Sequence, residues 1–156
     1  MKKLLMLLTV LLTISTVSVL AQENANKFHI GVESSTTTMI DDGDGISVSS
    51  VNCLFGYRLE KNLFALGLGL QSIGFNQLQI PLYVNYKHYF PKDSQVYTLA
   101  TASVGTVFNV DDYPGAYIDA GYGVGLSRFY GIIGVSMMTY DDVVFFGPSI
   151  KFGFSF

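Results

Sequence analysis

The sequence predicts an all-β fold, a single antiparallel up-and-down transmembrane β-barrel with eight strands as the expected number. An apolar leader begins the 156-residue chain, and beyond it apolar residues recur at every second position. The residues between them are mostly Gly, Ser, Ala and Asn. No run of about 18 or more apolar residues follows the leader, so a membrane crossing there would need β-strands.

Residues 1–21 have the features of a secretory signal peptide. Lys2 and Lys3 precede an apolar run over residues 4–12, and residues 19–21 end in the small residue Ala that suits a cleavage site. An uncleaved membrane anchor is the alternative, but hydroxyl residues dilute the second half of the leader and leave its apolar core short. We therefore expect a cleaved signal and export of the remainder.

Residues 22–156 are expected to form one domain. Cleavage would leave seven basic and twelve acidic residues, a net charge of −5, which argues against a nucleic-acid partner. The one cysteine, Cys53, has no second cysteine with which to form an intrachain disulfide. A small exported domain of this kind must be stabilised by a packed core or by a bilayer.

Eight segments show the two-residue periodicity of strands. In each of the clearest ones, bulky apolar residues occupy one face and small or polar residues the other. A soluble β-sandwich would also alternate, but a small-residue face suits a narrow barrel interior and a bulky face suits lipid. The predicted strands are 27–37, 51–59, 64–71, 80–87, 96–108, 116–127, 131–139 and 144–156.

An even number of strands puts both ends of the barrel chain on the same side, taken as periplasmic. The connections then separate by charge, because basic residues fall only in the inward turns and paired aspartates fall in the outward connections of about 4 to 8 residues. The inward turns hold Lys61, Lys92 and Arg128.

Aromatic residues near the strand ends are expected to form belts at the two membrane interfaces. The expected periplasmic belt is Tyr57, Tyr86, Tyr89, Phe90, Phe129, Tyr130 and Phe156, and the expected outer belt is Phe75, Phe108, Tyr113, Tyr117, Tyr140 and Phe145.

Two stretches resemble a known family. Residues 147–156 resemble the closing strand of outer-membrane barrel proteins, with Phe152, Phe154 and Phe156 at alternate positions. Residues 78–90 look like the central strand of the porin-like outer-membrane β-barrel domain proteins, which include small OmpA/OmpX-type barrels. The resemblance implies the outer membrane of a Gram-negative-type cell, and it implies that the barrel-assembly machinery reads the three phenylalanines.

By their strand faces, five charged residues should lie inside the barrel: Glu33, Arg58, Lys87, Asp119 and Lys151. Buried charges are costly unless they pair, and Glu33 and Lys151 are predicted to face each other across the seam between the first and last strands. Eight strands leave an interior that side chains nearly fill. We therefore expect an internal network that plugs the barrel, with an ion or proton path as the alternative.

Candidate chemistry is sparse. His29 and His88 both fall near periplasmic strand ends, away from any nucleophile and carboxylate, so an enzyme is not expected and neither is an organic cofactor. Paired aspartates in the outer connections could bind Ca²⁺ or Mg²⁺, and the cations could bridge to surface glycolipid. The preferred interpretation is that these aspartates simply form soluble turns. These residues are Asp41, Asp42, Asp44, Asp111, Asp112, Asp141 and Asp142.

The function expected from the sequence is that of an integral outer-membrane barrel with a plugged interior and a structural or surface-interaction role. Outer-membrane lipid and surface glycolipid are its expected partners. A narrow transport or porin-like barrel and a lipid-modifying barrel enzyme are the alternatives, and a soluble secreted β-protein is a third.

Overall fold

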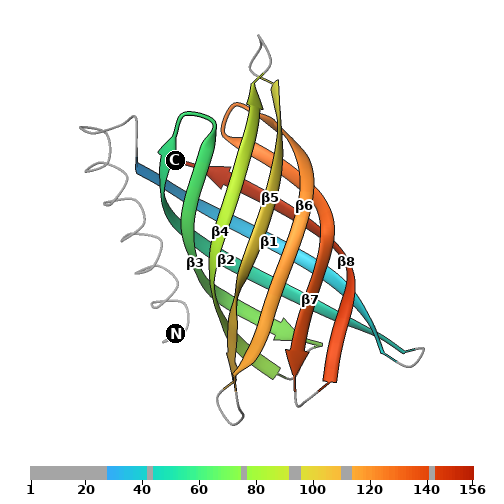
Figure 1. Ribbon diagram of the computed structural model, residues 1–156. Coiled ribbons are helices and arrows are strands. Elements are labelled where there is room, and N and C mark those ends of the chain that lie inside the picture. Colours follow the sequence, from blue (N-terminus) through green and yellow to red (C-terminus); the bar gives the residue numbers. More distant parts are fainter. Residues whose placement is uncertain (1–27, 42–43, 75–76, 92–95, 110–113, 141–142) are drawn as a thin grey trace, which may run out of the picture.

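The computed structural model describes residues 28–41, 44–74, 77–91, 96–109, 114–140 and 143–156. In these ranges the chain forms a closed antiparallel barrel of eight strands (Figure 1), as the sequence predicts. The strands are β1 (Phe28–Asp41), β2 (Asp44–Leu59), β3 (Asn62–Ile73), β4 (Gln77–Pro91), β5 (Val96–Asn109), β6 (Gly115–Leu126), β7 (Phe129–Tyr140) and β8 (Val143–Ser155).

Each strand pairs with its neighbours in the sequence, and β1 pairs with β8 to close the barrel. The connections β1–β2, β3–β4, β5–β6 and β7–β8 lie at one end, here called the loop end, at the bottom of Figure 1. The other three connections lie at the opposite end, here called the terminal end, together with the start of β1 and the end of β8. Residues 1–21, the predicted signal peptide, lie outside the described residues. Among the residues that the structure describes, no helix is long and apolar enough to cross a membrane.

All eight predicted strands are present, and the largest difference in length is at the first hairpin. The β1–β2 pairing continues to Asp41 opposite Asp44, whereas alternation in the sequence fades after residue 37 and resumes at residue 51. The outward positions there are hydroxyl residues such as Thr38 and Ser47, which carry no apolar signal. The β1–β2 connection is consequently two residues long, shorter than expected.

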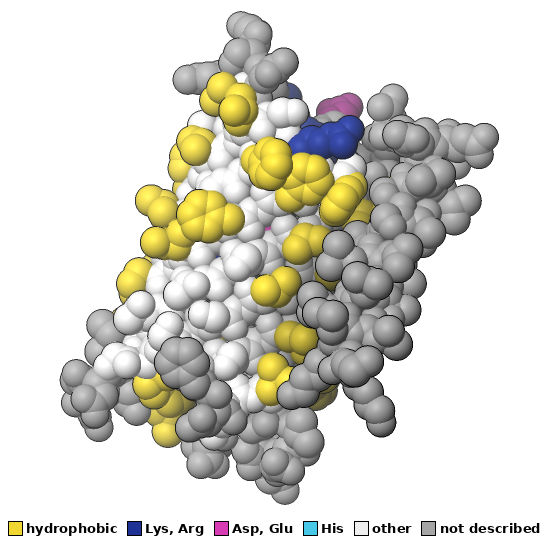
Figure 2. Space-filling model, turned by 180° about the vertical axis from the view of Figure 1, so that it is seen from behind, with side chains coloured by type: hydrophobic (Ala, Val, Ile, Leu, Met, Phe, Trp, Pro, Cys, Tyr) yellow, Lys and Arg dark blue, Asp and Glu magenta, His cyan; other side chains and the backbone are white. Residues whose placement is uncertain are grey.

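The outer wall of the barrel is apolar. Outward side chains such as Val51, Phe152 and Ile133 are more than half exposed, and Figure 2 shows hydrophobic side chains spread along the wall, with Lys and Arg side chains gathered near the upper, terminal end. Exposure of so much contiguous apolar surface is unfavourable in water. The wall therefore has the character of a surface in contact with lipid.

Three tyrosines fill the interior by lying over glycines of an adjacent strand. In each pair the two residues are cross-strand partners. A Cβ atom built on any of these glycines would overlap the ring of the partner tyrosine. The absence of a side chain therefore lets each ring lie along the inner wall. The pairs are Tyr83 with Gly67, Tyr97 with Gly125, and Tyr130 with Gly153.

Replacing Gly153 with Val should destabilise the barrel, because the new side chain must displace the Tyr130 ring. We expect a loss of about 1–3 kcal/mol in the free energy of unfolding, measured by urea titration of the folded protein in phospholipid vesicles. Gly131→Val is the matched control on β7: its Cβ faces outward and meets Phe152 at an ordinary 3.7 Å, so it should cost less than about 0.5 kcal/mol. Equal stability of the two variants would contradict this packing.

Candidate functional site: the barrel interior

A buried cluster joins three strands in the half of the barrel nearer the terminal end. Lys87 of β4 donates hydrogen bonds from Nζ to Glu33 Oε1 of β1 at 2.6 Å and to the Tyr130 hydroxyl of β7 at 2.8 Å. The Tyr130 hydroxyl donates to the same Glu33 oxygen at 2.8 Å. All three residues are buried, and the Glu33 and Lys87 side chains are 2% and 0% exposed. Mutual neutralisation and three hydrogen bonds make the burial of these two charges tolerable.

A second buried ion pair lies on the strands from β6 to β8. Lys151 Nζ of β8 donates to Asp119 Oδ1 of β6 at 2.5 Å. Ser136 of β7 donates to Asp119 Oδ2 at 2.8 Å, and Ser149 of β8 lies at 3.5 Å from the same oxygen. The carboxylate thus has hydrogen-bond partners on both oxygens.

Neutral polar side chains form contacts around these pairs. Asn85 Nδ2 donates to Thr101 Oγ1 and to Ser103 Oγ, both at 2.9 Å. Nearer the loop end, Gln71 Nε2 donates to Gln79 Oε1 at 3.1 Å. These hydrogen bonds join neighbouring strands along the inner wall, β4 to β5 and β3 to β4.

The predicted pairing of Glu33 with Lys151 is wrong. In the β1–β8 ladder Glu33 lies opposite Gly153, and Lys151 lies opposite Ser35. The prediction placed both residues at equal distances from their strand ends, but the ladder begins at Gly31 opposite Ser155, which displaces the register by two residues. Each charge instead pairs with a residue on a non-adjacent strand, which counting along the two seam strands could not reveal.

Arg58 is not a buried charge, contrary to the expectation. It is exposed near the terminal end, where β2 finishes at Leu59. Its guanidinium carbon lies 4.4 Å from the centre of the Tyr89 ring, and Nε donates to the carbonyl of Glu60 at 3.2 Å. A strand face that points inward becomes open to solvent at the end of a barrel.

The aromatic belts were assigned incorrectly in part. Tyr89, Tyr130 and Tyr117 face the interior and are buried, and Phe145 also faces inward and is half-buried. Of these four, Tyr130 is the one that hydrogen-bonds to the ion pair of Glu33 and Lys87. Its strand position shares the parity of inward-facing Ile132 and Ser136. Phe75 and Tyr113 lie outside the described residues, and the side chain of Tyr140 is not described.

The histidines lie apart from any catalytic arrangement within the described ranges. His29 is buried near the terminal end, and its Nε2 makes no hydrogen bond there. His88 faces outward, with Nδ1 2.8 Å from Asn62 Oδ1 and its ring against Phe90. Neither histidine hydrogen-bonds to Ser, Asp or Glu in this part of the chain.

The described residues contain no group of three or more His, Cys, Asp or Glu residues arranged to hold a metal ion. The aspartates considered as cation ligands lie almost entirely beyond that description. Asp41 and Asp44 are strand ends whose side chains are not described, and the other five lie outside the described residues: Asp42, Asp111, Asp112, Asp141 and Asp142.

Phe152 and Phe154 of β8 and the following residue, Phe156, line the outer wall beside the terminal end. Phe152 is 66% exposed. Phe154 is half-buried, with ring-centre distances of 4.7 Å to Phe129 and 4.8 Å to Phe156. This aromatic group forms part of the apolar exterior.

A closed barrel of eight strands with an apolar outer wall and buried polar side chains inside has the fold of small eight-stranded outer-membrane barrels. Two solved structures share the fold. Neisserial surface protein A (NspA) superposes with a TM-score of 0.59 at 13% sequence identity, covering 82% of this chain and 95% of that one. The N-terminal β-barrel domain of Pseudomonas aeruginosa OprF superposes with a TM-score of 0.51 at 14% identity, covering 82% and 97%. No protein-family model and no curated protein matches the sequence.

Replacing Lys87 with Met should strongly destabilise the barrel, because it leaves the Glu33 carboxylate buried without its cation. The expected loss is about 3–5 kcal/mol in the free energy of unfolding, measured by urea titration in vesicles. Lys61→Met, in the exposed β2–β3 turn, is the control and should change it by less than about 0.5 kcal/mol.

The double variant Glu33→Gln/Lys87→Met should recover part of the loss, because no uncompensated charge remains. If Lys87→Met proved as stable as Lys61→Met, the buried ion pair would not stabilise the barrel in the way described.

Proposed function

We propose that this chain is an integral outer-membrane protein of a Gram-negative-type cell, with a non-conducting interior and a structural or surface-interaction role. One observation carries the proposal: the barrel has apolar residues outside and ion pairs inside. Glu33, Lys87, Asp119 and Lys151 are all buried within a wall whose outward side chains are largely apolar. This is the reverse of a water-soluble protein and is the arrangement that a bilayer favours.

The fold comparison supports the same location. One of the two similar structures is named as a surface protein, and the other is a β-barrel domain. Side chains can fill the interior of an eight-stranded barrel, so a pore exists only where they leave a gap. In this barrel the interior side chains contact each other. The proposal therefore favours an interaction role over transport.

The proposed orientation puts the terminal end in the periplasm and the loop end outside the cell. It follows from export through the leader and from the charge of the connections, since those at the loop end carry aspartates and no Lys, Arg or His. Divalent cations bound by these aspartates could link the loops to anionic surface glycolipid. In the same scheme Phe152, Phe154 and Phe156 present the last strand to the barrel-assembly machinery.

We propose no enzymatic activity. Among the described residues, a nucleophile, a base and an orienting carboxylate do not meet, and the carboxylates of Glu33 and Asp119 already accept hydrogen bonds from Lys, Tyr and Ser. A lipid-modifying barrel would require such a group near the loop end.

Membrane fractionation tests the location. The protein should be recovered in the outer-membrane fraction and should change its electrophoretic mobility on boiling in detergent, because a folded barrel resists detergent at room temperature. A variant lacking residues 1–21 is the control and should be absent from that fraction. Recovery of the full-length protein in the soluble fraction without a mobility change would exclude the membrane barrel.

Conductance tests the closed interior. The purified protein, reconstituted in a planar lipid bilayer, should show no steady open channel, whereas a wide porin measured in parallel should conduct. A large and steady open state would defeat the plugged interior and restore the transport alternative.

A further inference from the structure

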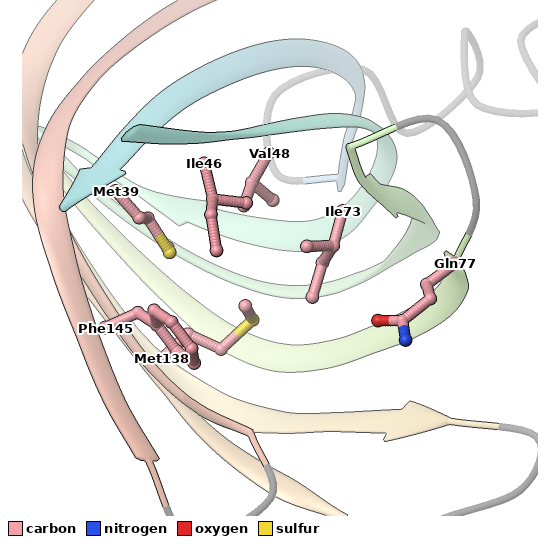
Figure 3. Close-up of a pocket in the computed structure, with 7 residues that line it drawn as sticks. All are labelled: Met39, Ile46, Val48, Ile73, Gln77, Met138 and Phe145. Carbon is pink, nitrogen blue, oxygen red and sulfur yellow. The ribbon is translucent and has the colours of Figure 1, made fainter. Parts of the chain in front are cut away.

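At the loop end the interior contains an apolar pocket, which the ion pairs do not explain. Its volume is about 130 Å³. Figure 3 shows Met39 and Ile46 across the pocket from Met138 and Phe145. The described residues that line it are Met39, Ile46, Val48, Ile73, Gln77, Met138 and Phe145, contributed by β1, β2, β3, β4, β7 and β8.

The pocket is unsuited to water. Gln77 is its one polar lining residue among those described, and Gln77 is exposed. A buried water needs two to four polar partners, and an engineered apolar cavity of about 150 Å³ stays dry and binds a small hydrocarbon. The flexible thioethers of Met39 and Met138 can also adjust to an incoming apolar group. The pocket is therefore chemically matched to hydrocarbon.

Side chains close the pocket on the side that faces the terminal end. Met138 Sδ lies 3.0 Å from Gln71 Nε2, and Gln71 also hydrogen-bonds to Gln79. These two glutamines lie one inward position below Ile73 and Gln77 on β3 and β4, so they form the floor. An apolar group that enters cannot continue past them into the polar interior without leaving their hydrogen bonds unmade.

Access from the bilayer is also blocked. The β1–β8 pairing continues to Ile40 opposite Phe146, and the β1–β2 pairing continues to Asp41 opposite Asp44, so backbone hydrogen bonds close the wall beside the pocket. An occupant must enter from the loop end. The volume admits one narrow chain rather than a two-chain lipid.

The charge around the loop end selects among headgroups. By sequence, three of the four connections there carry five aspartates in total, the strand ends Asp41 and Asp44 flank the first of them, and none of the four carries Lys, Arg or His. At physiological ionic strength such charges act over about 8 Å. Without divalent cations on these aspartates, an anionic headgroup would be repelled, and a neutral or cationic one would not.

We propose that this pocket binds the end of one unbranched alkyl chain, carried by a single-chain amphiphile that arrives from the aqueous side of the loop end with a neutral or cationic headgroup. This goes beyond the proposed function and does not depend on it, since a conducting barrel could still hold the chain.

The test uses the methionines as reporters. Met39 and Met138 line the pocket and are 2% and 1% exposed, whereas the adjacent Met137 faces outward. The full chain is labelled with ¹³C on the methionine methyl groups and folded in phospholipid nanodiscs. It is titrated with 1-hexanol, hexyltrimethylammonium, hexanoate and benzyl alcohol.

The expected result is a saturable shift of the Met39 and Met138 signals with 1-hexanol and hexyltrimethylammonium, while Met137 shows only the gradual change caused by partition into the bilayer. Hexanoate should bind about tenfold more weakly. Val48→Phe should abolish the saturable shift by filling the pocket. Val135→Phe, on the outer wall, is the matched control and should leave it unchanged.

The wild-type titration is decisive even if Val48→Phe fails to fold. Absence of a saturable shift at Met39 and Met138, or an equal saturable shift at Met137, would overturn the proposed site. Tightest binding of hexanoate would overturn the headgroup preference, and tighter binding of benzyl alcohol than of 1-hexanol would overturn the alkyl chain as the occupant.

Discussion

Closure of the sheet between β1 and β8 is the constraint on which the rest of the structure depends. It gives every strand two neighbours, so no row of backbone groups is left without partners at a sheet edge. Closing with only eight strands makes the interior narrow, and long side chains from non-adjacent strands then meet. Lys87 on β4 can reach Glu33 on β1 for this reason.

A glycine and an ion pair are linked through one tyrosine. Gly153 has no side chain, so the Tyr130 ring can lie against β8, and in that position its hydroxyl contacts both Glu33 and Lys87. The Tyr130 ring centre also lies 4.5 Å from Lys87 Nζ. The small residues of the inner face therefore have a specific structural role, because they determine where the polar groups of the network can lie.

The alternation of residues was sufficient to predict the strands and, for the clearest ones, which face points inward, because a period of two is a property of the single strand. The charge partners were not predictable in the same way. Glu33 and Lys87 are 54 residues apart in the sequence and meet across the lumen, and their meeting depends on the register between strands, which alternation does not specify. Alternation along the strand indicates that the Tyr130 side chain points inward. Tyrosine commonly lies at membrane interfaces, however, and the belt assignment followed that preference.

The interior changes character along the barrel axis, and this order limits what the barrel can do. Ion pairs occupy the middle and the half nearer the terminal end, the Gln71–Gln79 contact lies toward the loop end, and apolar side chains line the pocket beyond it. An apolar ligand moving from the loop end toward the terminal end would have to separate hydrogen-bonded amides and then charged pairs. An ion moving in the opposite direction would have to cross an apolar region. The polar layers oppose an apolar ligand and the apolar layer opposes an ion, so this order of layers supports the proposed contact role, at the loop end, over passage through the barrel.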